Sequence, residues 1–211
     1  MNASRYASNG KMATKRDDTP KASVAAKIWR LKVTLRGSRP PIWRRLEVHA
    51  NVTLFQLHEI LQIVMGWTNS HLHQFVRGST YYGQADPEFG MHRENERRIC
   101  LSDVLREPKD RMVYEYDFGD GWEHDIVLEA TASDTADRPL ARVLAGKGAC
   151  PPEDVGGIGG YYGFLEAVRN PKHPEHRDMA EWCGGDFDPD AFELDDINAY
   201  FQKRRRRRKD A

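Results

Sequence analysis

The segment 112–130 constrains the fold more than any other part of the chain. Apolar and aromatic side chains occupy alternate positions on both sides of Gly119-Asp120-Gly121, and acidic side chains occupy most positions between them. A period of two residues is typical of a strand with one buried and one solvated face. The sequence therefore predicts an antiparallel hairpin with a tight turn at the glycines. Its buried face is predicted to hold Met112, Tyr114, Tyr116 and Phe118 on one strand, and Trp122, His124, Ile126, Leu128 and Ala130 on the other.

Two further segments, 28–36 and 42–48, show the same alternation and are predicted as a second pair of strands. The clearest helix covers 53–66, because it starts with a Thr and a Gln at capping-box spacing and ends at a glycine. Its leucines recur at steps of three and four, which predicts a stripe facing the core. His58 lies off this stripe and is predicted as a boundary residue.

The second half of the chain reads mainly as helices and loop. Helices are expected at 161–168, 175–182 and 189–201, whereas the Gly- and Pro-rich segment 133–160 is expected to be a long loop. Together with the strands, these elements predict one α+β domain over residues 24–202, a mainly antiparallel sheet packed with helices.

The charges are distributed unevenly along the chain. Its 32 basic and 32 acidic residues balance, but the segment 203–211 is a basic tail that contains Arg204, Arg205, Arg206, Arg207 and Arg208. The polar segment 1–23 is predicted as a disordered tail. The body that remains is acidic and therefore poorly suited to grip a duplex, since phosphate contacts need cations. The arginine run is either a solvated tail or a weak nucleic-acid contact.

The sequence also indicates the compartment. No apolar run approaches the roughly 18 residues of a membrane span, and the N-terminal residues lack the apolar stretch of a secretory signal. The three cysteines, Cys100, Cys150 and Cys183, form no CxxC pair. This pattern favours a reducing environment, so we expect a cytoplasmic protein without membrane contact.

Several side chains could carry chemistry. His71 and His73 alternate on a predicted strand and could bind one metal ion, although a third ligand is needed. Carboxylates near the hairpin turn could form an acid–base pair or hold a divalent cation together with an imidazole. The alternative is structural: the acidic groups shape the turn and cap loop backbone. The candidates are Asp117, Asp120, His124, Glu153 and Asp154.

Aromatic residues suggest a different kind of site. Trp67, Tyr82, Trp122 and Tyr161 could wall a pocket for a small ligand, though core packing explains the same residue types. The Asp-Phe-Gly at 117–119 matches a kinase magnesium motif, but the other kinase motifs are missing.

Six ordered motifs resemble one known family, the plasmid pRiA4b ORF-three-like proteins, also labelled mobile-element passenger TnpR-type proteins. The resemblance spans roughly residues 27–201 and implies an α+β domain of the MM-3350-like type. It implies no reaction, substrate or catalytic residue. The motifs are Ile42–Leu46, Leu57–Gln62, Met65–Trp67, His71–Phe75, Tyr116–His124 and Cys150–Gly157.

These observations favour a non-catalytic module that binds protein or nucleic acid in mobile-element biology, because no complete catalytic constellation is present. Two alternatives stay open. One is a metal-dependent hydrolase or nuclease built on the acidic candidates, and the other is a small-ligand binder with an aromatic pocket. They differ in whether the segments 66–73, 114–126 and 150–157 converge in the fold.

Overall fold

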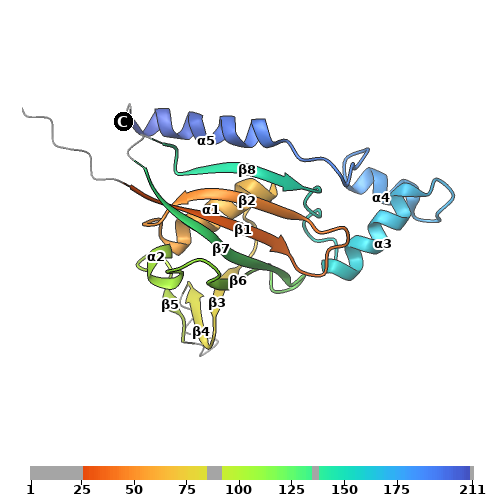
Figure 1. Cartoon of the computed structure of the whole chain (residues 1–211). Helices are drawn as coiled ribbons and strands as arrows, with labels where there is room; N and C mark the ends of the chain where they lie inside the picture. The colour runs from red at the N-terminus through yellow and green to blue at the C-terminus, as the bar shows by residue number, and fades with distance from the viewer. Residues whose placement is uncertain (1–25, 85–91, 135–137, 210–211) are drawn as a thin grey trace, which may run out of the picture.

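The computed structural model describes residues 26–84, 92–134 and 138–209. Its centre is one eight-stranded sheet with the order β5-β4-β3-β6-β7-β1-β2-β8 (Figure 1). All neighbours are antiparallel except the short pair β4–β5. The strands are β1 (Ala26–Leu35), β2 (Trp43–His49), β3 (His73–Arg77), β4 (Thr80–Gly83), β5 (Glu94–Asn95), β6 (Arg111–Tyr116), β7 (Trp122–Asp134) and β8 (Ala141–Lys147).

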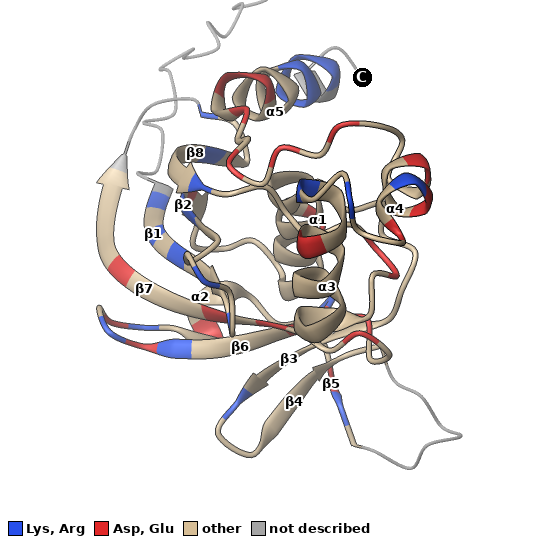
Figure 2. Ribbon diagram, turned by 90° about the vertical axis from the view of Figure 1, so that its right-hand side faces the viewer, with Lys and Arg blue, Asp and Glu red and all other residues tan. Residues whose placement is uncertain are grey.

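The helices lie on the concave side, along one edge and beyond one end of this sheet. Figure 2 shows the sheet curving around α1, and Figure 1 shows α5 running along β8 and α3 with α4 beyond the end of the strands. The predicted single α+β domain with a mainly antiparallel sheet is confirmed. The helices are α1 (Leu54–Met65), α2 (Leu101–Val104), α3 (Gly157–Arg169), α4 (His176–Trp182) and α5 (Leu194–Lys209).

The predicted hairpin is formed by β6 and β7. Tyr114 lies opposite His124, and Tyr116 lies opposite Trp122. These four side chains are fully buried on the same face, as the alternation predicts. Phe118 is the exception and is 40% exposed, because the strand ends at Tyr116 and the chain turns away from the sheet.

The first helix also forms as predicted. The Thr53 hydroxyl accepts a hydrogen bond from the Gln56 N–H at 3.2 Å, and the Gln56 Oε1 accepts one from the Thr53 N–H at 3.0 Å. Gly66 ends the helix in the left-handed region at φ 88°. The apolar stripe of α1 packs into the main core, which holds the helix against the sheet.

The segment 133–160 is not one long loop, and this expectation was wrong. β8 lies within it and pairs with β2 from Trp43↔Lys147 to Val48↔Ala141. Only Ala141 and Val143 of β8 are buried, so the sequence carries almost no alternation there. The partner strand, which is distant in sequence, supplies the hydrogen bonds that make this segment a strand.

The arginine run is part of α5, which extends to Lys209. Asn198 in this helix bonds the backbone of Val143 twice: its Oδ1 accepts from the N–H at 2.8 Å, and its Nδ2 donates to the carbonyl at 3.0 Å. These bonds hold α5 against the outer strand of the sheet. The basic segment is therefore helical as far as residue 209, and the expected N-terminal tail, 1–23, lies outside the described residues.

A buried arginine joins three parts of the domain. Arg44 on β2 donates from Nε to the Val64 carbonyl at 2.9 Å and from Nη2 to the Gly148 carbonyl at 2.9 Å. Its Nη1 donates to the carbonyls of Trp43 and Lys147, both at 3.0 Å. Burial lowers the pKa of Arg44, and the carbonyls compensate for the lost water. This side chain ties the end of α1 to the end of β8.

Candidate functional site

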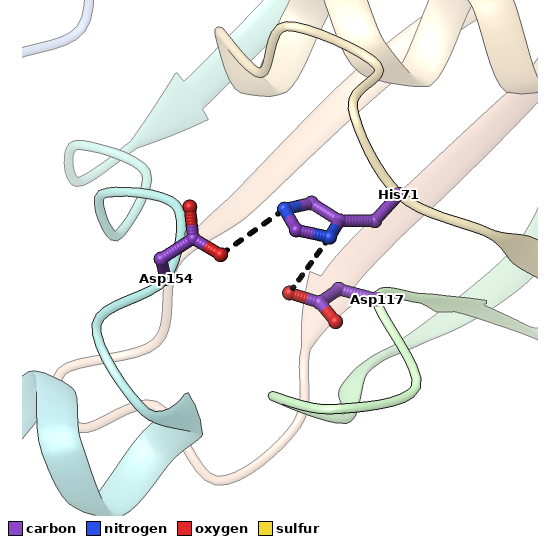
Figure 3. Close-up of side chains that lie close together, drawn as sticks. All are labelled: His71, Asp117 and Asp154. Atoms are coloured by element: carbon purple, nitrogen blue, oxygen red, sulfur yellow. Dashed lines mark ion pairs between the residues drawn. The ribbon is translucent and has the colours of Figure 1, made fainter.

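The three motif segments 66–73, 114–126 and 150–157 meet at one end of the sheet. There the His71 ring lies between two carboxylates (Figure 3). Its Nδ1 is 3.6 Å from Asp117 Oδ2, and its Nε2 is 3.3 Å from Asp154 Oδ1. One ligand atom from each of the three residues lies within 4.8 Å of the others.

The strand ends fix Asp117. Its N–H donates to the Leu72 carbonyl at 2.9 Å, which continues the pairing of β6 with β3 by one residue. Its backbone then enters the left-handed region, at φ 56°. The Oδ1 accepts from the N–H groups of Gly119 at 2.9 Å and Asp120 at 3.4 Å. The turn therefore holds one carboxylate oxygen and leaves the other to face His71.

Asp154 is carried by the loop before α3. Its backbone is also left-handed, at φ 61°, and its side chain is 70% exposed. The preceding Glu153 accepts from the Tyr116 hydroxyl at 2.5 Å and from both the N–H and the hydroxyl of Thr68. Burial and this carboxylate raise the pKa of Tyr116. Glu153 thus fastens the loop, while Asp154 points its carboxylate at His71.

A second pair of contacts docks the same loop onto the hairpin turn. The Asp120 carboxylate accepts from the Gly156 N–H at 3.1 Å. Gly157 has φ 67°, and a Cβ at this position would lie 2.4 Å from the Asp120 carbonyl oxygen. Only glycine permits that approach. Asp120 and Glu153 therefore position the site, whereas Asp117 and Asp154 face its imidazole.

Each carboxylate faces a different nitrogen of the His71 ring, so a metal ion could take only one of these two nitrogens. The two nitrogen–oxygen distances at His71 are at or beyond the usual hydrogen-bond range. Moreover, His71 Nε2 is buried without a hydrogen-bond partner among the described residues. One imidazole with two carboxylates suits Mn²⁺, Fe²⁺ or Zn²⁺.

The neighbouring histidine, His73, contacts a different set of residues. Its ring stacks on His58 with centroids 3.4 Å apart, and its Nε2 lies 2.8 Å from Glu96 Oε2. His71 and His73 thus face different partners and do not converge on one point. His58 is buried, so its prediction as a boundary residue was wrong.

A closed ring of hydrogen bonds joins four residues: His58, Gln62, Tyr114 and Asn69. Gln62 Nε2 donates to the Tyr114 hydroxyl at 2.9 Å, and that hydroxyl lies 2.8 Å from His58 Nδ1. His58 Nε2 lies 2.7 Å from Asn69 Oδ1, and the Asn69 N–H donates to Gln62 Oε1 at 3.0 Å. The ring is complete when His58 is neutral with its proton on Nε2. Burial and the nearby His73 lower the pKa of His58 to about 4.

His124 does not join the carboxylates. It is fully buried on the core face of β7, with Nδ1 at 3.1 Å from the Trp122 carbonyl. Burial lowers its pKa to about 4, so it is neutral at pH 7. The ring packs edge-on against Trp67 at 5.3 Å between centroids. Its place is in the core beneath the site.

The four aromatic candidates lie mainly in packed positions. Trp67 donates from Nε1 to the Pro151 carbonyl at 3.1 Å and lies 6.1 Å from Trp122 between ring centroids. Trp67, Trp122 and Tyr161 belong to the core, and Tyr82 is partly buried against it. Tyr82 and Tyr161 line two separate cavities.

The protein is a single α+β domain, and its histidine–carboxylate cluster lies where three loops meet. The chain belongs to the family described as plasmid pRiA4b ORF-3-like protein, whose model matches residues 27–196. This confirms the resemblance that the sequence motifs indicated. Within the described ranges, no helix has the length and apolar character needed to cross a bilayer.

Two similar proteins place the chain among relatives without an assigned activity. The uncharacterized protein y4hQ of Sinorhizobium fredii is 41% identical over 178 residues, which are 83% of this chain and 91% of that protein. The crystal structure of MM3350, a protein of unknown function from Methanosarcina mazei, matches with a TM-score of 0.73 at 34% identity. That match covers 82% of this chain and 98% of MM3350.

Proposed function

We propose that this protein is a divalent-cation-binding module in which His71, Asp117 and Asp154 hold one ion. The observation that carries the proposal is the approach of one ligand atom from each residue to within 4.8 Å of the others. A neutral imidazole offers a single lone pair. The ion therefore takes one ring nitrogen, and the remaining N–H faces a carboxylate.

Electrostatics and local backbone support the same conclusion. Two carboxylates flank one imidazole, so a divalent cation would balance their charge. Two of the three residues, Asp117 and Asp154, hold left-handed backbone. Aspartate tolerates this region better than most residues, but such conformations still concentrate at functional sites. The hydrogen bonds to Asp117 Oδ1 would orient this ligand in advance.

The experiment is a comparison of isosteric variants. Metal-free protein is titrated with Mn²⁺ and Zn²⁺ by calorimetry, with Asp117→Asn, Asp154→Asn and Asp120→Asn alongside the wild type. Loss of a ligand should weaken binding by about tenfold or more. Asp120→Asn is the matched control, because its amide oxygen can still accept from the Gly156 N–H. Equal affinities for all four proteins, or no saturable binding to the wild type, would reject the proposal.

The open side of the site favours one activity. Since Asp154 is 70% exposed, an ion there would keep positions for water or for an anionic group of a substrate. A metal-bound water is a nucleophile near neutral pH, which would support a metal-dependent hydrolase or nuclease. Hydrolysis of bis(p-nitrophenyl) phosphate with Mn²⁺, lost in Asp154→Asn and kept in Asp120→Asn, would support this activity. Equal rates of hydrolysis in both variants would contradict the hydrolase activity and would not affect the proposal that the site binds a cation.

A nucleic-acid contact through α5 is the second candidate. Figure 2 shows Lys and Arg gathered at the C-terminal end of this helix, with acidic residues at its start. Such a cationic helix end would bind phosphates by counterion release. In Arg206→Gln/Arg207→Gln the slope of binding against salt should decrease by about one to two. An unchanged slope, or no binding by the wild type, contradicts this candidate.

A cytoplasmic location and a role in mobile-element biology are two broader hypotheses. The cysteines Cys100, Cys150 and Cys183 are free thiols, which supports a cytoplasmic location. A role in mobile-element biology is supported by the plasmid origin in the family's description. Both are independent of the cation site.

A further inference from the structure

A small cavity lies between α3 and the ends of three central strands. Its volume is about 150 Å³, and its wall comes from the loop that joins β1 to β2, the end of β8, α3 and the segment 189–190 before α5. Sites for drug-sized ligands begin at roughly 300 Å³. The cavity therefore suits a small ion rather than a cofactor. None of His71, Asp117 and Asp154 lines it.

Hydrogen bonds between the wall segments hold the cavity in shape. The Tyr162 hydroxyl on α3 donates to the Gly37 carbonyl at 3.2 Å and accepts from the Arg39 N–H at 2.5 Å. The Ala149 N–H donates to the Pro189 carbonyl at 2.9 Å. The first set fixes α3 to the loop between β1 and β2, and the second fixes the end of β8 to the segment before α5.

The lining carries more positive than negative charge. Arg39, Lys147 and Arg169 come from three different segments of the wall. None of these three forms an ion pair with any other residue that the structure describes. Asp190 is the acidic residue of the lining, and the nearby Asp188 accepts from its N–H at 2.9 Å. Three cations exceed two carboxylates even when Asp188 is counted.

Tyr161 adds a hydrogen-bond donor to the same lining. Only 3% of this residue is exposed, and its hydroxyl forms no hydrogen bond with another described residue. Burial raises the pKa of Tyr161 to about 12, so the hydroxyl keeps its proton at pH 7. The three cations are exposed, and salt screens charges in that position. The buried hydroxyl is therefore the group that would give binding a defined position.

We propose that this cavity binds a phosphate ion. The Tyr161 hydroxyl donates to one phosphate oxygen, and the three cations balance the charge. Guanidinium groups form charge-assisted, often bidentate hydrogen bonds with phosphate. A phosphate group carries a charge of about −1.5 to −2 near pH 7 and has more acceptor oxygens than a carboxylate. It can therefore use cations from three segments at once.

The test compares two anions on the metal-free full chain. Calorimetric titrations with inorganic phosphate and with acetate are made at the same ionic strength. Phosphate should bind at least about tenfold more tightly than acetate. No saturable phosphate binding, or equal affinity for both anions, overturns the proposal. Without metal, the carboxylates beside His71 repel phosphate, so either result leaves the Mn²⁺ and Zn²⁺ titrations of the cation site unaffected.

Two double variants of equal charge locate the site. Arg39→Gln/Arg169→Gln removes lining cations and should weaken phosphate binding about tenfold or more. Arg111→Gln/Arg142→Gln removes the same charge from exposed positions outside the lining and should leave the affinity unchanged. An equal loss in both variants means general attraction to a basic surface and contradicts a defined site.

Tyr161→Phe tests the buried donor. The substitution keeps the ring in the core and removes a hydroxyl that bonds no described residue, so the urea midpoint should stay unchanged. Phosphate binding should weaken about tenfold, because a hydrogen bond to a charged group is lost. Wild-type affinity in this variant would show that the anion does not contact the hydroxyl and would contradict the proposed site.

Discussion

His71 and His73 stand two residues apart, yet their surroundings differ in one decisive respect. His73 stacks on the ring of His58, and both nitrogens of His58 have close partners within a closed ring of hydrogen bonds. His71 has carboxylates on both sides at distances longer than good hydrogen bonds, and its Nε2 is buried without such a bond among the described residues. A satisfied polar group in the core stabilises a fold, whereas an unsatisfied one at the edge indicates a ligand.

The difference follows from the elements that hold each group. The His58 set sits between α1 and the middle of the sheet, where burial makes an unpaired polar atom costly. The His71 group sits where two strands end and a loop returns, so one side stays open to solvent. The first arrangement should therefore dominate stability, and the second should dominate binding.

The largest expected effect comes from breaking the closed ring. His58→Ala leaves a cavity and deprives Tyr114 and Asn69 of their partner. We expect the free energy of unfolding to fall by about 4 kcal/mol, measured by urea denaturation with circular dichroism. A loss below about 1 kcal/mol would show that the ring is not a structural unit.

The second effect is a dependence of stability on pH. The pKa of His58 is lowered to about 4 in the folded state, against an ordinary value of 6.5. The unfolded chain therefore gains a proton as pH falls below about 6.5, and the folded chain does not until about 4. The free energy of unfolding should fall by about 3 kcal/mol as the pH drops through this window. At pH values above the unfolded pKa, His58 is neutral in both states and makes stability no more dependent on pH.

The matching control is His58→Asn, measured by urea denaturation at pH 7.5, 5.5 and 4.5. The pKa of His124 is lowered in the same way, so the comparison with this variant isolates the contribution of His58. The variant should lose less stability than the wild type on acidification. Equal losses would contradict a neutral His58.

Tyr114→Phe should have a smaller effect. It removes only the hydroxyl that joins Gln62 to His58 and keeps the ring packed. Two buried groups then lose a partner, which should cost about 2 kcal/mol in the same urea assay. Stability equal to the wild type would mean that water or a rearranged side chain replaces the hydroxyl.

Asp154→Asn is expected to have the smallest effect on stability. The side chain is 70% exposed, so the free energy of unfolding without metal should change by less than about 0.5 kcal/mol. Mn²⁺ should raise the melting temperature of the wild type and not that of the variant. A large loss without metal would assign Asp154 to the fold rather than to binding.

Local patterns predicted much of this molecule. The alternation around 112–130 predicts the hairpin, and the capping box with its glycine stop predicts α1, because both depend on neighbouring residues. β8 was missed because Ala141–Lys147 shows little periodicity of its own and is held by pairing with β2. Arg44 shares the buried face of its strand with apolar residues, but only distant carbonyls explain why a cation is tolerated there.

The site was predictable in part for the same reason. The sequence selects Asp117 and Asp154 as carboxylates near the predicted hairpin turn and its partner loop, and His71 because it alternates with His73 on a predicted strand. It cannot give the distance between three segments, nor separate Asp120, which docks a loop, from Asp154, which faces the imidazole. Glu96 was missed because its partner His73 is 23 residues away.

Anomalous diffraction from a crystal soaked in Mn²⁺ tests the central claim most directly. The account predicts a peak within coordination distance, about 2.0–2.3 Å, of one His71 nitrogen and of oxygens from Asp117 and Asp154. The His58–His73 stack should show none. A peak at that stack, or no peak near His71 at a saturating concentration, would contradict the division between the satisfied His58 ring and an open cation site.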